Sequence, residues 1–115
     1  MVFQNIIEIW GGVMRFYKNL VVGSRIENVN KVKRMLKKCI AVYDVHCICV
    51  RSDAKNLMEI IPATQILKQP YTELDYLIIG LASDKKEAFS LVASILETHI
   101  QKGGGLATLK KMYSE

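Results

Sequence analysis

The chain has 115 residues and a formal net charge of +5 at pH 7, which fits one domain of ordinary size and leaves little room for two. Half of the residues are apolar and 23% are charged, a composition that excludes intrinsic disorder. The positive balance favours contacts with polyanions but does not by itself identify a nucleic-acid-binding protein. Three cysteines, Cys39, Cys47 and Cys49, follow no recognisable secretory leader, so we expect free thiols and a cytoplasmic location.

Residues 1–13 differ from the rest of the chain. They are apolar, they end near a pair of glycines and they precede a second methionine, Met14. We therefore expect an N-terminal appendage over 1–13 and a single α+β domain over 14–115. Charged side chains interrupt the apolar run at Glu8, Arg15 and Lys18. A membrane span is therefore not expected, and the positive charge follows the apolar residues, whereas in a signal peptide it precedes them.

Large apolar side chains are concentrated in this appendage. In water such a patch is an association site, and the commonest closed assembly is a symmetric dimer. The side chains predicted to form this oligomer interface are Ile6, Ile9, Trp10 and Val13. Two alternatives stay open: the segment covers the protein's own sheet, or it lies on a membrane surface with Trp10 at the interface.

The first predicted elements are a short extended stretch over 17–23 and an amphipathic helix. Ser24 and Glu27 have the spacing of a capping box, which predicts that the helix begins at Arg25. Apolar residues recur at helical spacing as far as Tyr43, so the helix is predicted to end near Val42. Its other side is basic and carries Lys31, Lys33, Arg34, Lys37 and Lys38.

The basic side of this helix predicts a nucleic-acid contact through Lys31, Arg34 and Lys38 as an alternative function. The usual meaning of such a pattern is a solvated helix face. The helix also lacks the interleaved aromatic residues on which single-strand binders stack bases. Nucleic acid is therefore a possible partner and not the favoured one.

Residues 45–50 are an apolar hexapeptide with β-branched and cysteine side chains, which predicts a strand. Because both of its faces are apolar, we expect it at the centre of the sheet. Residues 54–69 form either a return strand over 57–61 or a crossover helix. Pro62 inside such a helix costs about 3 kcal/mol, which favours a hairpin followed by a short helix over 63–68.

The C-terminal part of the chain predicts a strand over 76–82 and a helix over 85–101. Asp84 and Glu87 form a second capping box at the helix start, and glycines at 103–105 end the helix. Its expected inward residues are Ala88, Leu91, Val92, Ile95, Leu96, His99 and Ile100. A short final helix over 106–113 is predicted to place Leu109 and Met112 on the core.

Candidate chemistry is sparse. His46, Cys47 and Cys49 are metal-ligand residue types, but no second pair follows at zinc-site spacing, so we interpret both cysteines as core residues and expect neither metal nor cofactor. His99 is interpreted as a partly buried histidine with its hydrogen bonds satisfied. The stretch over 80–86 lacks the glycine that a P-loop has before its lysine. No catalytic residue can be named, so an enzyme is not favoured.

Four short stretches resemble small uncharacterised bacterial proteins of about this length. They are 17–23, 59–62, 69–71 and 78–82, the last followed by Glu87 and Ala88. The resemblance spans about 14–102, implies a compact α/β unit and carries over no functional residue. The sequence thus predicts an α+β fold with a small three- to four-stranded mixed or antiparallel sheet packed against two main helices. The favoured function is a non-catalytic, homo-oligomeric interaction or assembly module. An unassigned enzyme or small-ligand carrier is a further alternative.

Overall fold

A computed structural model describes residues 15–51, 57–68 and 76–114 of the chain. Its centre is one four-stranded sheet in the order β1-β4-β2-β3. The strands are β1 (Arg15–Val22), β2 (His46–Arg51), β3 (Glu59–Pro62) and β4 (Tyr76–Ala82). β1 runs parallel to β4, whereas β2 is antiparallel to both β3 and β4. The sheet is therefore mixed, and the predicted α+β class is confirmed.

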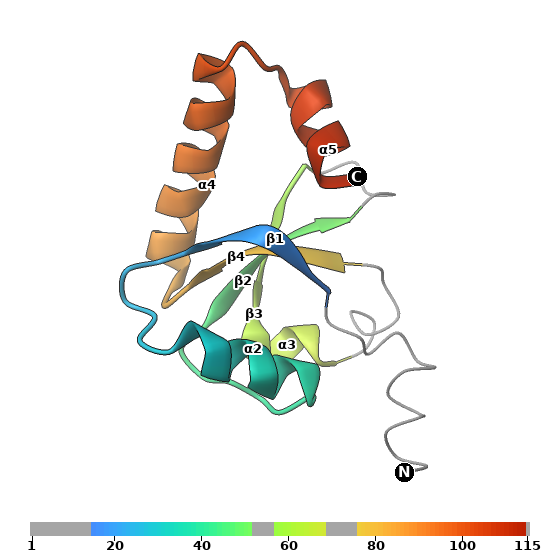
Figure 1. Cartoon of the computed structure of the whole chain (residues 1–115). Coiled ribbons are helices and arrows are strands. Elements are labelled where there is room, and N and C mark those ends of the chain that lie inside the picture. Colours follow the sequence, from blue (N-terminus) through green and yellow to red (C-terminus); the bar gives the residue numbers. More distant parts are fainter. Residues whose placement is uncertain (1–14, 52–56, 69–75, 115) are drawn as a thin grey trace.

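Helices cover both faces of the sheet (Figure 1). α2 (Val29–Lys37) and α3 (Ala63–Ile66) lie on one face, and α4 (Lys85–Gln101) and α5 (Leu106–Ser114) lie on the other. Each face has its own apolar cluster, and the sheet separates the two clusters. Among the described residues, no helix is long and apolar enough to cross a membrane.

β2 occupies the central position that its two apolar faces predict. Cys47 and Cys49 belong to the cluster under α2, and Ile48 and Val50 belong to the cluster under α4. Side chains alternate between the faces of a strand, so a strand buried on both faces needs an apolar residue at every position. The strand predicted over 45–50 is confirmed.

The structure confirms the predicted hairpin and not the alternative crossover helix. β3 pairs antiparallel with β2, with Cys47 opposite Ile61 and Cys49 opposite Glu59. Pro62 ends β3 and lies directly before α3, where its missing N–H group removes no helical hydrogen bond.

The predicted start of α2 is wrong. The helix begins at Val29, and its N-cap is Asn28, whose carboxamide oxygen accepts a hydrogen bond from the Lys31 N–H at 3.1 Å. Ser24 instead lies in a turn, in which the Ile26 N–H donates to the Gly23 carbonyl oxygen at 3.1 Å. This turn carries Ile26 to the core beside α2, so packing of Ile26 displaces the helix start by one turn.

The predicted end of α2 is also wrong, because the helix stops at Lys37. The Ile40 N–H donates to the Met35 carbonyl oxygen at 2.9 Å and the Cys39 N–H donates to that of Leu36 at 3.0 Å. This is the hydrogen-bond pattern of a Schellman cap, which needs a residue at positive φ. Cys39 takes that position with φ 58°. Glycine is the usual residue there, so the sequence does not reveal this helix end.

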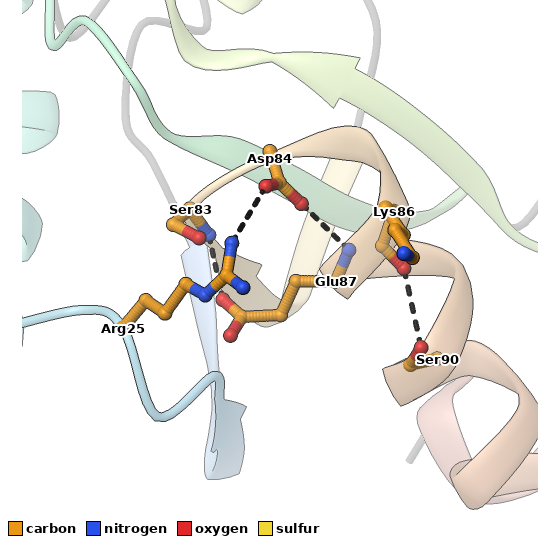
Figure 2. A network of polar contacts seen from close by, with 6 residues as sticks. All are labelled: Arg25, Ser83, Asp84, Lys86, Glu87 and Ser90. Atoms are coloured by element: carbon orange, nitrogen blue, oxygen red, sulfur yellow. Dashed lines mark hydrogen bonds and ion pairs between the residues drawn. The ribbon is translucent and has the colours of Figure 1, made fainter.

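The second capping box is confirmed at the start of α4. The Asp84 carboxylate accepts a hydrogen bond from the Glu87 N–H at 2.7 Å, and the Glu87 carboxylate accepts one from the Ser83 N–H at 2.8 Å (Figure 2). In the usual capping box the Glu side chain accepts a hydrogen bond from the N–H of the N-cap residue itself. Here Glu87 accepts it from the N–H of Ser83, one residue before the N-cap. Gly103, with φ 85°, follows the helix C-terminus as predicted.

α5 returns toward the sheet and anchors its C-terminal end there (Figure 1). Leu109 is buried as predicted, but Met112 is 37% exposed and Tyr113 is buried in its place. The Tyr113 ring meets the Tyr17 ring of β1 edge-on, with 4.9 Å between centroids. Because these two rings are in contact, α5 is rotated about its own axis by about one residue relative to the predicted orientation.

Candidate interaction surface

The surface with the clearest chemical character lies on α4. At 100° per residue, the apolar residues of this helix form two adjacent stripes that together cover more than half of its circumference. One stripe consists of Ala88, Leu91, Ile95 and His99. The other, which we name the open stripe, consists of Phe89, Ala93, Leu96 and Ile100, with Val92 on the border between the two.

The domain covers the first stripe and, of the open stripe, Leu96, which packs against the apolar cluster on this face of the sheet. Ala88 is fully buried, and Leu91 and Ile95 pack against the apolar cluster on this face of the sheet. In the open stripe, Phe89 is 57% exposed and Ile100 is 60% exposed. Ala93 is also exposed, and Leu96 is half-buried.

The prediction that Ile100 faces the core is therefore wrong. A helical wheel identifies apolar positions, but it does not say how many of them the rest of the domain covers. The C-terminal half of α4 rises away from the sheet (Figure 1), and Ile100 lies in the last turn of the helix, where its side chain stays exposed.

The N-terminus of α4 is held by the network of polar contacts in Figure 2. Besides the two capping bonds, the Arg25 Nη1 lies 3.1 Å from the Asp84 Oδ2 and ties the segment after β1 to the helix start. A Cβ atom at Gly23 would displace the Glu87 carboxylate, so glycine leaves room for the capping bond from the Ser83 N–H to Glu87. Both carboxylates are used in helix capping, which explains the polar cluster without a ligand.

The C-terminus of α4 is held by His99. Its Nε2 atom lies 3.0 Å from the Gly105 carbonyl oxygen and 2.9 Å from the Thr108 Oγ1, which suits an imidazole protonated at Nε2. Thr108 also accepts a hydrogen bond from the Gly105 N–H at 2.9 Å. His99 is therefore partly buried, as predicted, and is hydrogen-bonded through its Nε2 atom. The orientation of α4 is thus fixed at both ends, while Phe89, Ala93 and Ile100 of its open stripe stay exposed.

The three predicted nucleic-acid contacts are all exposed on α2. Lys31 and Arg34 lie on the helix, and Lys38 is its C-cap. Two further lysines lie over the Phe16 ring of β1, with their Nζ atoms 5.4 Å (Lys33) and 5.6 Å (Lys37) from its centroid. The structure therefore gathers the positive charge of α2 on its outer surface. The other predicted site residues, Ile6, Ile9, Trp10 and Val13, lie outside the described residues.

The two strand cysteines lie in the core, where burial raises the pKa of the Cys47 thiol to about 12. Burial also raises the pKa of Cys49, with smaller contributions from Cys47 and Glu59. Both thiols are protonated at neutral pH, and a protonated thiol is neither a nucleophile nor a metal ligand. No three His, Cys, Asp or Glu residues in the described parts of the chain are placed to hold a metal ion.

A polar cluster that the sequence does not reveal lies at the opposite end of the sheet. The Tyr76 hydroxyl donates to the Glu59 Oε2 at 3.0 Å, and the Arg51 guanidinium lies 5.7 Å from the Tyr76 ring centroid. Burial, together with the hydrogen bond to Glu59, raises the pKa of Tyr76 to about 12. Tyr76 therefore stays a hydrogen-bond donor at neutral pH and joins β4 to β3. Cross-strand register brings these residues together, and register is not visible in separate stretches of sequence.

Comparisons of the chain with protein-family models, with curated proteins and with solved structures found no significant match.

Proposed function

We propose that this protein is a non-catalytic assembly module that associates with copies of itself through the open stripe of α4. The observation that carries the proposal is the exposure of Phe89 and Ile100, 57% and 60%, on a helix whose two ends are fixed. A phenylalanine side chain contributes 150–250 Å², so Phe89 alone presents on the order of 100 Å² of apolar surface to solvent. Contiguous exposed apolar side chains mark interaction sites.

The residues around the open stripe support an interface. Ser90, Ser94 and Glu97 are exposed along one side of α4, and Lys85 lies at its N-terminal end with its Nζ 5.8 Å from the Phe89 ring centroid. An apolar centre with a polar rim is the usual anatomy of a protein interface.

We also propose that the protein is cytoplasmic and has no catalytic role. Three thiols, two of them buried, suit a reducing compartment. The raised pKa values of Cys47 and Tyr76 suit structural groups better than a nucleophile or a general base.

Replacing Phe89 with Glu tests the proposal. A carboxylate cannot be buried in an apolar contact without a partner, so we expect Phe89→Glu to raise the dissociation constant of the assembly at least tenfold, measured by light scattering. Ser94→Glu is the matched control because it adds the same charge on the polar side of α4, and its dissociation constant should match the wild type.

Two outcomes would contradict the assembly through α4. One is equal weakening by Phe89→Glu and Ser94→Glu. The other is an assembly that survives Phe89→Glu and is lost when Ile6 and Trp10 are replaced by Ser in the full chain, because that result would place the interface in residues 1–13.

Nucleic-acid binding by α2 is the second candidate, favoured by the outward placement of Lys31, Arg34 and Lys38. Replacing all three with Gln removes three charges that can pair with phosphates, so we expect at least tenfold weaker binding of a mixed-sequence duplex at low salt and a smaller salt dependence. The matched control carries Gln at Lys86, Lys102 and Lys111, which are exposed on α4 and α5 or between them. Equal binding by both triple variants, or no shift in an electrophoretic assay, would remove this candidate.

A further inference from the structure

We infer that α2 and the connection that follows it, residues 38–44, bind the surface of an anionic lipid membrane. The inference goes beyond the proposed assembly and does not depend on it. Basic side chains of α2 meet the charged groups of the lipids, and exposed apolar side chains of the connection enter the membrane interface. We name these exposed apolar residues, Ile40, Ala41 and Tyr43, the apolar tip.

The outer side of α2 is positively charged. Lys31, Arg34 and Lys38 are exposed and lie three and four residues apart, which places them on one side of the helix, opposite the buried Leu36. The two lysines over the Phe16 ring add charge on the side toward β1. A cluster of about four to eight basic residues on an amphipathic helix is typical of contacts with anionic lipids.

Few carboxylates oppose this charge. Residues 28–44 carry five basic side chains and one carboxylate, Asp44, and a second carboxylate, Glu27, lies just before the N-cap; both are exposed. Asp44 has φ 60°, and aspartate adopts this conformation more readily than most residues, so the backbone accounts for its presence. Lys68 is exposed after α3, on the same face of the sheet. This side of the protein therefore stays positive.

The backbone of the connection is held in place at several points. It begins with the Schellman cap of α2, Val42 packs into the cluster under α2, and the Val45 carbonyl oxygen accepts a hydrogen bond from the Ala63 N–H at 2.9 Å. The apolar tip nevertheless faces solvent, with Tyr43 76% exposed and Ile40 45% exposed. In Figure 1, α2, α3 and this connection form the side of the described chain farthest from α4.

The composition of the apolar tip favours a lipid surface over a nucleic acid. Proteins that bind single strands stack successive bases on aromatic side chains, whereas the tip has one aromatic residue and two aliphatic ones. Aliphatic side chains leave water when they enter the boundary between headgroups and acyl chains, and tyrosine is enriched at that depth. Stable attachment takes two signals, and this surface offers a basic one and an apolar one.

Co-sedimentation of the full chain with vesicles tests the inference. We expect binding to phosphatidylcholine vesicles that contain about 30% phosphatidylserine, weaker binding at high salt and little binding to pure phosphatidylcholine. Replacing Lys31, Arg34 and Lys38 with Gln should weaken binding at least tenfold, because each basic residue near the surface contributes about fivefold. The control with Gln at Lys86, Lys102 and Lys111 should stay within about twofold of the wild type, since distant charges are screened.

The contribution of the apolar tip is measured at Tyr43. Tyr43→Ser should weaken vesicle binding at least threefold, and Tyr43→Phe, which keeps the ring, should bind as the wild type does. Met112→Ser is the matched control, because it removes an exposed apolar side chain from α5 on the other face of the sheet, and it should change nothing. Circular dichroism should show an unchanged helix content in each variant.

Tryptophan fluorescence reports directly on insertion of the tip. The chain has a single tryptophan, Trp10, so the double variant Trp10→Phe/Tyr43→Trp carries its only indole at position 43. The emission should move to shorter wavelength on anionic vesicles, because the indole leaves water for the membrane interface. An unchanged emission wavelength in vesicle-bound protein would overturn the inference.

Three further outcomes would overturn it. One is the absence of binding to anionic vesicles, and another is equal weakening by the two triple variants. The third is binding that survives Tyr43→Ser but is lost in Ile6→Ser/Trp10→Ser, which would place the membrane contact in residues 1–13. Binding of DNA without binding of vesicles would assign α2 to the nucleic-acid candidate instead. A chain that stays monomeric and binds vesicles would contradict the proposed assembly and leave this inference in place.

Discussion

Raising the pH from 8 to about 10.5 is expected to lower the free energy of unfolding by about 2 kcal/mol through Cys47 alone. The pKa of this thiol is 9.0 when unperturbed and about 12 in the folded protein, because of burial. The folded state therefore keeps a proton that the unfolded state releases above pH 9. This contribution to stability is fully present below pH 9 and is lost as the pH rises toward 12. The raised pKa of Cys49 acts in the same direction.

Urea unfolding under a reductant at the two pH values measures this effect. In Cys47→Ala the loss of stability between pH 8 and 10.5 should be smaller than in the wild type by about 2 kcal/mol, because the titrating group is absent. Equal unfolding free energies of the wild type at both pH values would contradict the burial of the thiols.

Replacing Gly80 with Ser is expected to cost about 3 kcal/mol of stability, since it overpacks the core and buries a hydroxyl group. Gly80 lies in β4 between β1 and β2, and a Cβ atom there would lie 2.9 Å from the Ile48 Cδ1 and 3.2 Å from the Val21 carbonyl oxygen. The Val21 contact is with backbone, and the Ile48 side chain is fully buried in the core, so neither neighbour has room to move away.

Gly105→Ser is the matched control for Gly80→Ser. Gly105 lies directly before α5 and has open space around it, and serine is a preferred residue at a helix N-cap. Thermal unfolding should show a lower midpoint for Gly80→Ser and a midpoint near the wild-type value for Gly105→Ser. Equal midpoints for the two variants would show that β4 does not pack tightly at Gly80.

The elements that the sequence predicts well are those whose signals are local. The β-branched and apolar runs at 45–50 and 76–82 form the two central strands, because a strand covered on both faces has no polar position. Asp84 and Gly103 set the limits of α4 through hydrogen bonds to residues within one turn. Pro62 selects the hairpin because a proline cannot lie inside a helix at low cost.

The features that the sequence does not predict depend on tertiary contacts. The limits of α2 follow from the packing of Ile26 and from a cysteine at positive φ. The exposure of Ile100 follows from the angle at which α4 leaves the sheet, which the contacts of His99 and Tyr113 help to set. The open stripe therefore could not be recognised from apolar spacing, although each of its residues was visible in the sequence.

Sedimentation equilibrium of the wild-type chain tests self-association most directly. One chain has a mass of 13.0 kDa, and the measurement should cover concentrations from about 1 μM to about 500 μM, the range in which weak dimers dissociate. Self-association through α4 predicts a weight-average mass that rises with concentration toward that of two chains. A mass of 13.0 kDa at every concentration would contradict it.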